Sequence, residues 1–463
     1  MSAPSVAAGG PGLPRGEDPV VVIGAGPAGL AAAEHLLDAG RRVVVVDGAP
    51  VVGGLSRSVE RWGHRLDLGP HSFLSSSHPE SVARWLDLAG AAGGVERTEA
   101  VRAAVWRGRV VGFPPRPLDV LRTAGPVTTA RFALDRLRPR RPAPGTTGGS
   151  AYDALVARHG LAVVADLFVP YCRKYLGVHP RDLSPAFAHK LQGTRRGWTG
   201  PVDLLTPRAG TGAVWDELAR RLRARGARVL LGTPVVGLTV AGERVTGVRC
   251  GRAGATGPEQ EQTLAASAVV SSAPAAVLRR WLPGTGTSTP TPAAAPAFTA
   301  RDTYLVHLRL AAGPGGGVGQ NAHYVTAYDP QVRTGRLSNT RSWRPETFGR
   351  APDTVLCAEF WSSGQDDLSA RTDDQLAALA VSELPVFGVD PRVRVLDHDV
   401  LRLPRSVPVL TRGVEAARAG LDAALDRWTN LTRVGRHGTH DWDGQEDALL
   451  TGRSTGAHVL RGA

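Results

Sequence analysis

Cysteine is scarce in this sequence. The 463 residues include three cysteines, Cys172, Cys250 and Cys357, which lie far apart along the chain. Three scattered cysteines are too few for a disulfide framework and have no metal-binding spacing. We therefore expect no metal site, and a chain that suits a reducing compartment such as the cytoplasm.

Long hydrophobic runs and a signal sequence are also missing. No stretch of about 18 apolar residues occurs, so we expect no transmembrane segment. Residues 1–18 are small and polar and lack the positive start and apolar run of a signal peptide. We predict a disordered tail there, and peripheral membrane contact stays open.

Lysine is nearly absent although the chain is basic, with a formal net charge of +13. Almost all cations are arginines, and together with abundant alanine, glycine and proline this indicates a coding bias. The arginines are spread along the chain, apart from a proline-punctuated stretch at residues 136–141. A spread of this kind does not form a nucleic-acid surface, so we expect a small-molecule substrate and no nucleic acid.

The composition otherwise fits a globular protein. The hydrophobic content of 42% is ample for one large core or two smaller ones. Residues 141–150, 251–262 and 283–297 are typical of loops or linkers and divide the middle of the chain.

A βαβ unit is predicted directly after the tail. Val20–Ile23 is a strand-like apolar run, and the glycine-rich residues 24–29 lead from it into a helical pattern at residues 30–39. Gly40 ends the helix, and a second buried strand, Val43–Val46, ends on Asp47.

Each glycine of this G-x-G-x-x-G segment has a physical purpose in a dinucleotide site. Gly24 allows the tight turn, Gly26 lets the backbone approach a pyrophosphate, and Gly29 lets helix and strand pack closely. Pro27 and Ala28 lie at the helix N-terminus, which stabilises phosphate charge. Asp47 is placed to accept hydrogen bonds from a ribose hydroxyl. The alternative is a tight βα turn without a ligand.

The residues after Asp47 distinguish FAD from NAD. Val51–Arg57 contains Gly53-Gly54 and resembles the Gly-Gly motif of FAD enzymes in the amine oxidase and protoporphyrinogen oxidase superfamily. The resemblance implies that FAD is the cofactor, that Gly53 and Gly54 pass close to it, and that Arg57 lies near it. The alternative for the two glycines alone is an ordinary loop.

Other segments extend the resemblance from residue 20 to residue 460. Arg65–His71 is similar to the segment with which the protoporphyrinogen oxidase-like and UDP-galactopyranose mutase-like branches bring Gly69, Pro70 and His71 next to the flavin. Phe168–Gly177 is similar to their YxxKxxG segment. Asn430–Gly438 resembles their closing flavin-binding signature, which implies cofactor contacts by two further residues, Gly435 and Arg436.

Two more features belong to the implied cofactor set. Glu446–Leu460 is predicted as a helix whose N-terminus faces the flavin pyrimidine and stabilises negative charge on the reduced ring. Val235, which follows a strand pattern at residues 228–231, is also expected to contact FAD.

The resemblance implies an α/β fold: a Rossmann-like FAD-binding domain, with a parallel sheet and helices, plus an interleaved mixed α+β substrate domain. We expect the FAD-binding domain to comprise residues 19–75, 206–294 and 411–463. The substrate domain is expected to comprise a helical segment, residues 76–205, and a mixed-sheet segment, residues 295–410. Within the latter, strands are predicted at 304–310, 323–328 and 355–361 and a helix near 373–384.

Few residues are diagnostic of the chemistry, because the flavin itself performs the redox step. The catalytic candidates are His71, Lys190, Arg336, Trp442 and Glu446. For each, a structural role such as a salt bridge or a helix cap is at least as common. Trp361 is a candidate aromatic wall, although a tryptophan is more often part of the core.

The resemblance implies an FAD-dependent oxidoreductase that removes hydride from a carbon next to nitrogen, oxygen or an unsaturated system. We expect a role in the biosynthesis of a sugar-containing or other secondary metabolite. A second interpretation is a non-redox flavin-dependent nucleotide-sugar mutase, and a third is a non-catalytic flavin-binding partner protein. The electron acceptor and the oligomeric state stay open.

The mutase interpretation meets departures from that branch. Lys190 occupies the position aligned with the first phosphate-binding arginine, and Val407-Pro408 replaces the expected Tyr-Pro. A tyrosine expected soon afterwards is missing from residues 410–414. The cations left to hold a phosphate are Arg336, Arg341 and Arg344.

Overall fold

The structure is a computed structural model of the 463-residue chain. It describes residues 18–71, 73–75, 77–137, 149–191, 203–251, 261–283, 298–311, 322–349 and 351–462. The predicted tail, apart from Asp18, and most of the three predicted linkers lie outside the described residues. The chain divides into a first unit, Met1–Arg57, Val214–Thr289 and Ala419–Ala463, and a second unit, Ser58–Ala213 and Pro290–Arg418.

The first unit is built on a five-stranded sheet with the strand order β10-β2-β1-β14-β20. All four strand pairs are parallel. The strands are β1 (Val20–Ile23), β2 (Val43–Val46), β10 (Arg228–Leu230), β14 (Ala268–Ser271) and β20 (Leu431–Arg433). Strands β1, β2 and β14 are buried throughout, which explains their continuous valine runs: a parallel sheet is covered on both faces. The predicted βαβ unit and the parallel sheet are confirmed.

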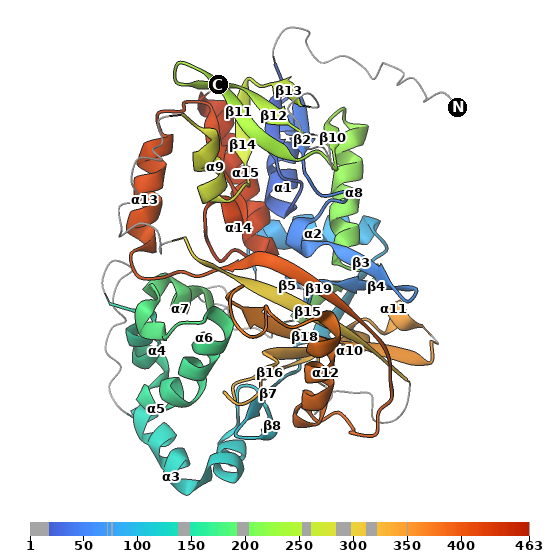
Figure 1. The fold of residues 1–463 in the computed structure, drawn as a ribbon, viewed down its shortest axis with the longest axis vertical. Helices are drawn as coiled ribbons and strands as arrows, with labels where there is room; N and C mark the ends of the chain where they lie inside the picture. The colour runs from blue at the N-terminus through green and yellow to red at the C-terminus, as the bar shows by residue number, and fades with distance from the viewer. Residues whose placement is uncertain are drawn as a thin grey trace. The chain divides into compact units, whose positions relative to one another are not determined.

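Helices and a small antiparallel sheet complete the first unit (Figure 1). The antiparallel sheet has the order β11-β12-β13. The elements are α1 (Pro27–Asp38), α8 (Thr211–Ala224), β11 (Val235–Ala241), β12 (Arg244–Cys250), β13 (Gln262–Ala265), α9 (Ala275–Trp281), α13 (Val414–Leu425), α14 (Gly435–Gly438) and α15 (Gln445–Gly462), of which α8 and α13 begin in the second unit.

Helices α1 and α15 pack side by side (Figure 1). A Cβ atom added at Gly452 would lie 2.5 Å from the carbonyl oxygen of Ala28, and one at Gly456 would lie 3.1 Å from His35 Cβ. Glycine therefore sets the short distance between the two helix backbones. Since α1 begins at the glycine-rich turn, α15 supports that turn from the C-terminal end of the chain.

The second unit is built on a seven-stranded sheet with the order β19-β15-β18-β17-β16-β7-β8. Its strands are antiparallel except for the parallel pair of β16 and β7, so the predicted mixed sheet is confirmed. The strands are β7 (Arg102–Trp106), β8 (Arg109–Gly112), β15 (Ala300–Ala311), β16 (Tyr324–Ala327), β17 (Arg336–Asn339), β18 (Asp353–Ser362) and β19 (Val395–Pro408). Strands β7 and β8 come from the segment that we expected to be helical.

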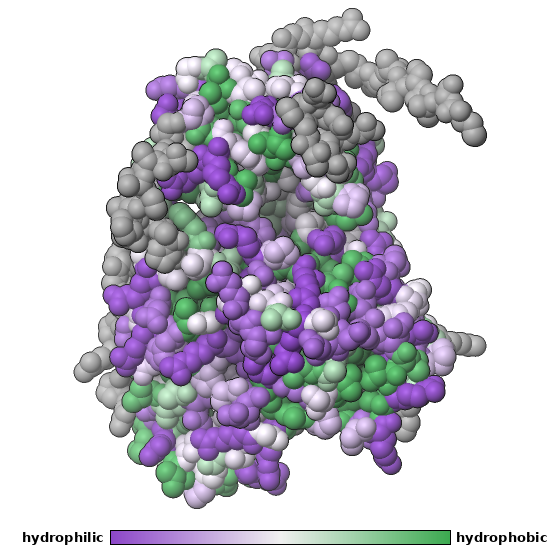
Figure 2. All heavy atoms as spheres, in the orientation of Figure 1, coloured by the Kyte–Doolittle hydropathy of each residue, from purple (hydrophilic) through white to green (hydrophobic). Residues whose placement is uncertain are grey.

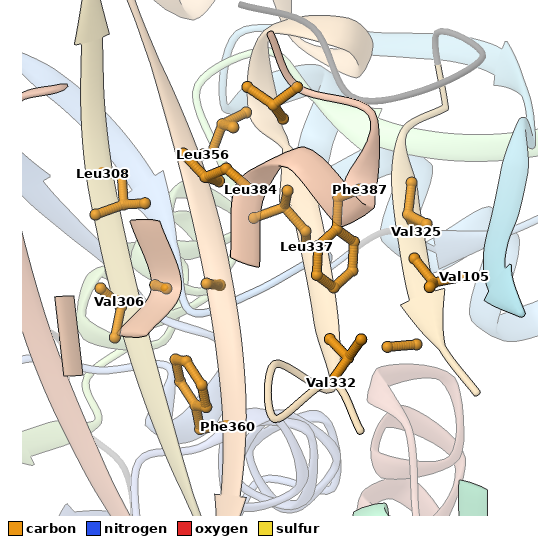
Figure 3. Close-up of a cluster of buried hydrophobic side chains, with 14 of the residues drawn as sticks. Val105, Val306, Leu308, Val325, Val332, Leu337, Leu356, Phe360, Leu384 and Phe387 are labelled. Carbon is orange, nitrogen blue, oxygen red and sulfur yellow. The ribbon is translucent and has the colours of Figure 1, made fainter. Parts of the chain in front are cut away.

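The core of the second unit lies between this sheet and the segment of α12 (Asp373–Glu383) and the 3-10 helix η6 (Leu384–Phe387). In Figure 3, Leu384 and Phe387 lie beside Leu337 of β17. The cluster also includes Val105, Val306, Leu308, Val325, Val332, Leu356 and Phe360, all at most 6% exposed. Alternation of inward apolar residues along β15 and β18 produces this layer.

The remaining elements of the second unit are short helices and two small sheets, β3-β4 and β5-β9-β6. Among the described residues, no helix has both the length and the apolar character to cross a bilayer. The elements are β3 (Ser58–Arg61), β4 (His64–Asp67), β5 (Phe73–Leu74), α2 (Pro79–Ala91), β6 (Val95–Glu99), α3 (Pro117–Leu137), α4 (Ala151–His159), α5 (Leu161–Val163), α6 (Val169–Leu176), α7 (Pro185–Leu191), β9 (Asp203–Pro207), α10 (Thr340–Trp343) and α11 (Pro345–Phe348).

Residues 58–75 group with the second unit, whereas we expected them in the FAD-binding domain. Asp67 contributes to this grouping, because its carboxylate accepts a hydrogen bond from the Thr211 N–H at 3.0 Å and pairs with Arg344 at 3.1 Å. The assignment of whole segments to an FAD-binding and a substrate domain stays a prediction.

Candidate functional site

The turn between β1 and α1 is sterically reserved for glycine. Gly24 has φ +105°, and a Cβ atom there would lie 1.9 Å from the Ser272 Oγ. A Cβ atom on Gly29 would lie 2.0 Å from the carbonyl oxygen of Gly24. The Gly24 N–H donates to the Val46 carbonyl at 2.8 Å, so the turn is fixed to the end of β2.

The Gly53-Gly54 segment lies against the same turn. The Gly53 N–H donates to the Ala25 carbonyl at 2.8 Å, and a Cβ atom on Gly54 would lie 3.3 Å from the Cα of Gly26. Both Gly53 and Gly54 have positive φ, at +96° and +53°. We call Gly24, Gly26, Gly29, Gly53 and Gly54 the glycine cradle, since they present bare backbone at one place.

The glycine cradle opens at the N-terminus of α1. Gly26 is the N-cap and no side chain caps the helix. Pro27 takes the first position, where its missing N–H is not needed. Ala28 and Gly29 follow in the first turn, where N–H groups have no partner within the helix. Bare backbone with such donors suits a pyrophosphate, so the residues present fit a dinucleotide.

Asp47 is held in a defined orientation at the end of β2. One carboxylate oxygen accepts from the Ala25 N–H at 2.7 Å, and the other accepts from the Ala49 N–H at 2.8 Å. Each oxygen has a further lone pair, and the residue is only partly buried. Binding of a ribose hydroxyl by Asp47 fits this geometry and stays a prediction.

Arg57 and Val235 lie on segments that are tied to the same region. The Arg57 guanidinium donates to the Gly54 carbonyl at 2.8 Å. Burial lowers the pKa of Arg57, and the Asp47 carboxylate opposes that shift. Val235 begins β11 two residues after Thr233, whose N–H donates to the Asp47 carbonyl at 2.8 Å.

The C-terminal signature also reaches α1. A Cβ atom on Gly435, at φ +74°, would lie 3.0 Å from the Cβ of Ala28. The Arg436 guanidinium donates to the Asp443 carbonyl at 2.9 and 2.7 Å, so it fixes the loop before α15. This structural role is additional to the predicted cofactor contact of Arg436.

Trp442 and Glu446 flank the start of α15. The Trp442 N–H donates to the Asp441 carboxylate at 2.7 Å, and the side chain is partly exposed. The predicted helix is confirmed and begins at Gln445. Glu446 lies in its first turn, where a carboxylate stabilises the helix N-terminus. A catalytic role for either residue stays a prediction.

In the second unit, the Gly69-Pro70-His71 segment lies beside Glu359. Gly69 has φ +95°, and a Cβ atom there would lie 3.4 Å from the Glu359 Oε1. The His71 carbonyl accepts from the Thr211 hydroxyl at 3.1 Å, which fixes the segment, and the residue is partly exposed.

Glu359 forms a bidentate ion pair with Arg336, which we call the Arg336–Glu359 pair. The two N–H···O distances are 2.6 and 2.7 Å, and the residues are cross-strand neighbours on β17 and β18. The Glu359 side chain is 4% exposed and that of Arg336 is 30% exposed. Burial lowers the pKa of Arg336, but Glu359 outweighs burial, so the pKa lies above its ordinary value.

Four aromatic side chains, which we call the aromatic wall, lie close to this pair. Tyr175 and Trp361 have ring centroids 4.6 Å apart, Tyr171 lies 6.4 Å from Trp361, and Tyr171 and Tyr328 lie 5.6 Å apart. Tyr171 interacts electrostatically with Arg336. Burial, and then Tyr175 and Tyr328, raise the pKa of Tyr171 well above its ordinary value.

The YxxKxxG segment is the scaffold of the aromatic wall. Lys174 donates to the carbonyl oxygens of Ala327 and Asp329 at 2.9 and 2.6 Å, which fastens α6 to the end of β16. Burial lowers the pKa of Lys174 to about 8. Gly177, at φ +75°, ends α6 in the left-handed conformation.

Glu359, Tyr175 and Tyr328 are not among the residues predicted from the sequence, whereas Tyr171 opens the YxxKxxG segment. Glu359 is a carboxylate within the otherwise apolar run Val355–Trp361, and a buried charge of that kind needs a partner. A carboxylate within an apolar run is therefore the sequence signal that could have identified Glu359. Trp361 is only 5% exposed, and its ring occupies the space beside Gly335, where a Cβ atom would lie 2.0 Å away.

The other predicted cations lie elsewhere in the second unit. Lys190 lies in the last turn of α7, where a cation stabilises the helix end. Arg341 donates to the carbonyls of Ala351 and Asp353, and Arg344 is 2% exposed and pairs with Asp67. Of the three arginines that we considered for phosphate binding, Arg336 and Arg341 are therefore partly exposed and Arg344 is buried.

The comparison with known families follows this geometry. The sequence profile described as "Flavin containing amine oxidoreductase" matches residues 27–460. The chain belongs to this family. It is accordingly an FAD-dependent oxidoreductase, as predicted, and the cradle is where its residues fit the dinucleotide.

Individual relatives show how far the similarity extends. A phytoene dehydrogenase from Streptomyces griseus is 60% identical over 53 residues, 11% of this chain and 10% of the relative. The chain thus matches only about a tenth of the length of that relative.

Solved structures match over nearly the whole chain. Reduced UDP-galactopyranose mutase has a TM-score of 0.74 at 18% identity, with 96% of each chain covered. Cyclohexylamine oxidase from Brevibacterium oxydans has a TM-score of 0.63 at 18% identity, with 96% and 99% covered. At this identity the likeness shows the shared fold alone.

Proposed function

We propose that this flavoenzyme oxidises a carbon next to nitrogen, oxygen or an unsaturated system in a small organic substrate with a flat or ring-containing body. FAD, when bound, supplies the hydride acceptor. The observation that carries the proposal is the Arg336–Glu359 pair beside the aromatic wall, next to Gly69 on the same unit.

The chain's own residues have distinct parts in this proposal. The glycine cradle, with Pro27 and Ala28, holds the pyrophosphate, and Asp47 holds the ribose. Gly435, Arg436, Arg57 and Val235 complete the cofactor contacts in the first unit. By the family resemblance, Gly69, Pro70 and His71 also belong to the cofactor-binding set, and His71, Trp442, Glu446 and Lys190 stay candidates for proton transfer.

The charge balance around Arg336 favours oxidation over nucleotide-sugar isomerisation. A diphosphate needs cations whose charge is not already compensated, and Arg336 gives two of its five N–H groups to the Glu359 carboxylate, which neutralises its charge. Arg341 and Arg344 are engaged with backbone carbonyls and Asp67. A neutral pair next to tyrosine and tryptophan rings suits one polar group on an apolar or unsaturated body.

We also propose a biological role and a location for the enzyme. The role is in the biosynthesis of a sugar-containing or other secondary metabolite, and the location is the cytoplasm. The name of the phytoene dehydrogenase relative adds conjugated polyenes to the substrates worth testing.

The test is anaerobic stopped-flow absorbance of the holoenzyme at about 450 nm, where oxidised flavin absorbs. The panel contains amines, porphyrinogens, polyenes, polyketide-like alcohols and nucleotide sugars. Bleaching by one class of C–H donor supports the proposal and names that class.

Two other outcomes overturn it. If no compound bleaches the flavin but the dithionite-reduced enzyme isomerises a nucleotide sugar without net oxidation, the chain is a mutase. If the flavin spectrum is unchanged with every compound and no isomerisation occurs, the chain binds flavin without this catalysis.

A further inference from the structure

Exposed large hydrophobic side chains concentrate on α3 and its neighbour α5. Across the described residues, ten large hydrophobic side chains are exposed, and five of them belong to α3. They are 43–81% exposed, and Leu161 of α5 is 50% exposed. We call these six residues the α3 patch: Leu118, Leu121, Val127, Leu134, Leu137 and Leu161.

The α3 patch is the outer side of an element whose inner side is already packed. Val120 is 5% exposed and packs with Trp106 and Val111, and Ala124 and Phe132 pack against the same cluster. Asp135 accepts from the Ala162 N–H at 2.6 Å, which fixes α5 beside the C-terminal part of α3. The inner side of α3 is thus packed against the second unit, and the residues of the α3 patch are not the ones that make this packing.

Helical spacing places the patch residues of the second half of α3 on one face. The helix is interrupted at Gly125, with φ 79° and ψ 174°, and Pro126 begins the second half. Val127, Leu134 and Leu137 recur at intervals of seven and three residues, which places them on one face. Arg131 lies within the same face and is exposed.

Exposed arginines surround the patch. Arg109, Arg116, Arg122 and Arg131 are all exposed, and the Arg109 guanidinium lies 3.5 Å from the Arg122 carbonyl, which places it beside α3. The two acidic residues of α3, Asp119 and Asp135, both accept hydrogen bonds from backbone N–H groups. Figure 2 shows hydrophobic and hydrophilic side chains next to one another over α3.

We propose that the α3 patch docks on the surface of an anionic lipid bilayer. Apolar side chains on a helix, ringed by arginines, insert at the boundary between headgroups and acyl chains while the guanidinium groups contact lipid phosphates. The proposal does not depend on the reaction that the flavin site performs.

The test is flotation of the full-length holoenzyme with vesicles of phosphatidylcholine alone or mixed with phosphatidylserine. We expect binding to the mixed vesicles only, and weaker binding at high salt, because salt screens the arginines. The variant L134E/L137E lowers affinity about tenfold or more, since it replaces two exposed leucines. The variant R122E/R131E lowers affinity about fivefold for each arginine changed.

Matched controls separate the patch from general changes in surface. V236E/L396E makes the same substitution at two hydrophobic side chains that are 41% and 40% exposed outside α3. R223E/R280E makes the same charge change at exposed arginines elsewhere. Both controls keep wild-type vesicle binding, and flavin absorbance verifies that each variant is folded.

Three results overturn the proposal. The first is no binding to either type of vesicle. The second is equal loss of binding in the α3 variants and in their controls. The third is a wild-type dimer, seen by sedimentation without lipid, that L134E/L137E dissociates while vesicle binding is absent, which makes the patch a self-association surface.

Discussion

The glycine cradle of the first unit and the Arg336–Glu359 pair of the second unit are built in different ways. The cradle presents backbone, and all of its residues lie close together in the sequence, between Gly24 and Gly54. The pair and its aromatic wall present side chains from α6 and from the segment of Tyr328, β17 and β18, and α6 is more than a hundred residues away from that segment in the chain. At Gly24 and Gly29 the backbone site has no room for a Cβ atom, whereas a side-chain site fails when a partner is lost.

The largest expected effect is at the cradle. Gly29→Ala places a Cβ atom 2.0 Å from the Gly24 carbonyl oxygen, so α1 must shift from the turn. We expect FAD affinity to fall on the order of 10- to 100-fold, measured by flavin fluorescence titration. Gly90→Ala is the control, because nothing lies within 4 Å of the added atom. Unchanged FAD affinity in Gly29→Ala contradicts a pyrophosphate site at this turn.

The next effect is at the Arg336–Glu359 pair. Glu359→Ala leaves the Arg336 guanidinium without its bidentate partner, and we expect the free energy of unfolding to fall by about 2 kcal/mol, reduced because Arg336 is partly exposed. Urea denaturation measures this change. Substrate turnover falls as well, while FAD affinity does not.

Two variants sharpen this result. Asp367→Ala breaks the exposed Arg333–Asp367 pair and changes stability by less than about 0.5 kcal/mol. Glu359→Gln keeps an acceptor and recovers part of the stability. If Glu359→Ala is no more destabilising than Asp367→Ala, the pair does not organise the second unit.

A side chain at the edge of the cradle gives a smaller effect. Asp47→Ala removes the acceptor for two backbone N–H groups and for the ribose, and we expect FAD to bind about tenfold more weakly. Asp38→Ala, at an exposed carboxylate that pairs with Arg225, leaves the affinity unchanged. If Asp47→Ala and Asp38→Ala bind FAD with equal affinity, Asp47 fixes the turn and does not bind the cofactor.

The smallest effect is a pH dependence in the scaffold of the aromatic wall. Burial lowers the pKa of Lys174 to about 8 from 10.5, so between these values the unfolded chain binds a proton that the folded chain has lost. The contribution of Lys174 to stability therefore rises with pH across this window, by about 1 kcal/mol after allowance for residual solvation. The buried cysteines act in the opposite direction, because burial raises their pKa, so Lys174 is isolated by comparing wild type with Lys174→Met. We expect the difference in free energy of unfolding between the two proteins, measured by urea denaturation, to change by this amount between pH 8 and pH 10.5. A difference that is the same at both pH values contradicts the assignment to Lys174.

Much of the fold of the first unit is predictable because the residues that indicate it are close together in the sequence. The valine runs of β1 and β2, the glycines between β1 and α1 and the acidic residue after β2 lie within 30 residues, and the structure contains the predicted strands and helix. The domain boundary near residue 57 is different, since residues after it contact segments far away in sequence, as Asp67 contacts Thr211 and Arg344.

The sequence by itself determined the βαβ unit, the family resemblance and the FAD cofactor, because backbone geometry at glycines and the period of buried strands are written in neighbouring residues. Only the tertiary structure decided that Glu359 neutralises Arg336, that Arg344 is buried against Asp67, and that the hydrophobic residues of α3 divide between a packed side and an exposed side. Each of these depends on the pairing of segments distant in sequence. The sequence does not show whether a charged residue or a leucine contacts another side chain or solvent.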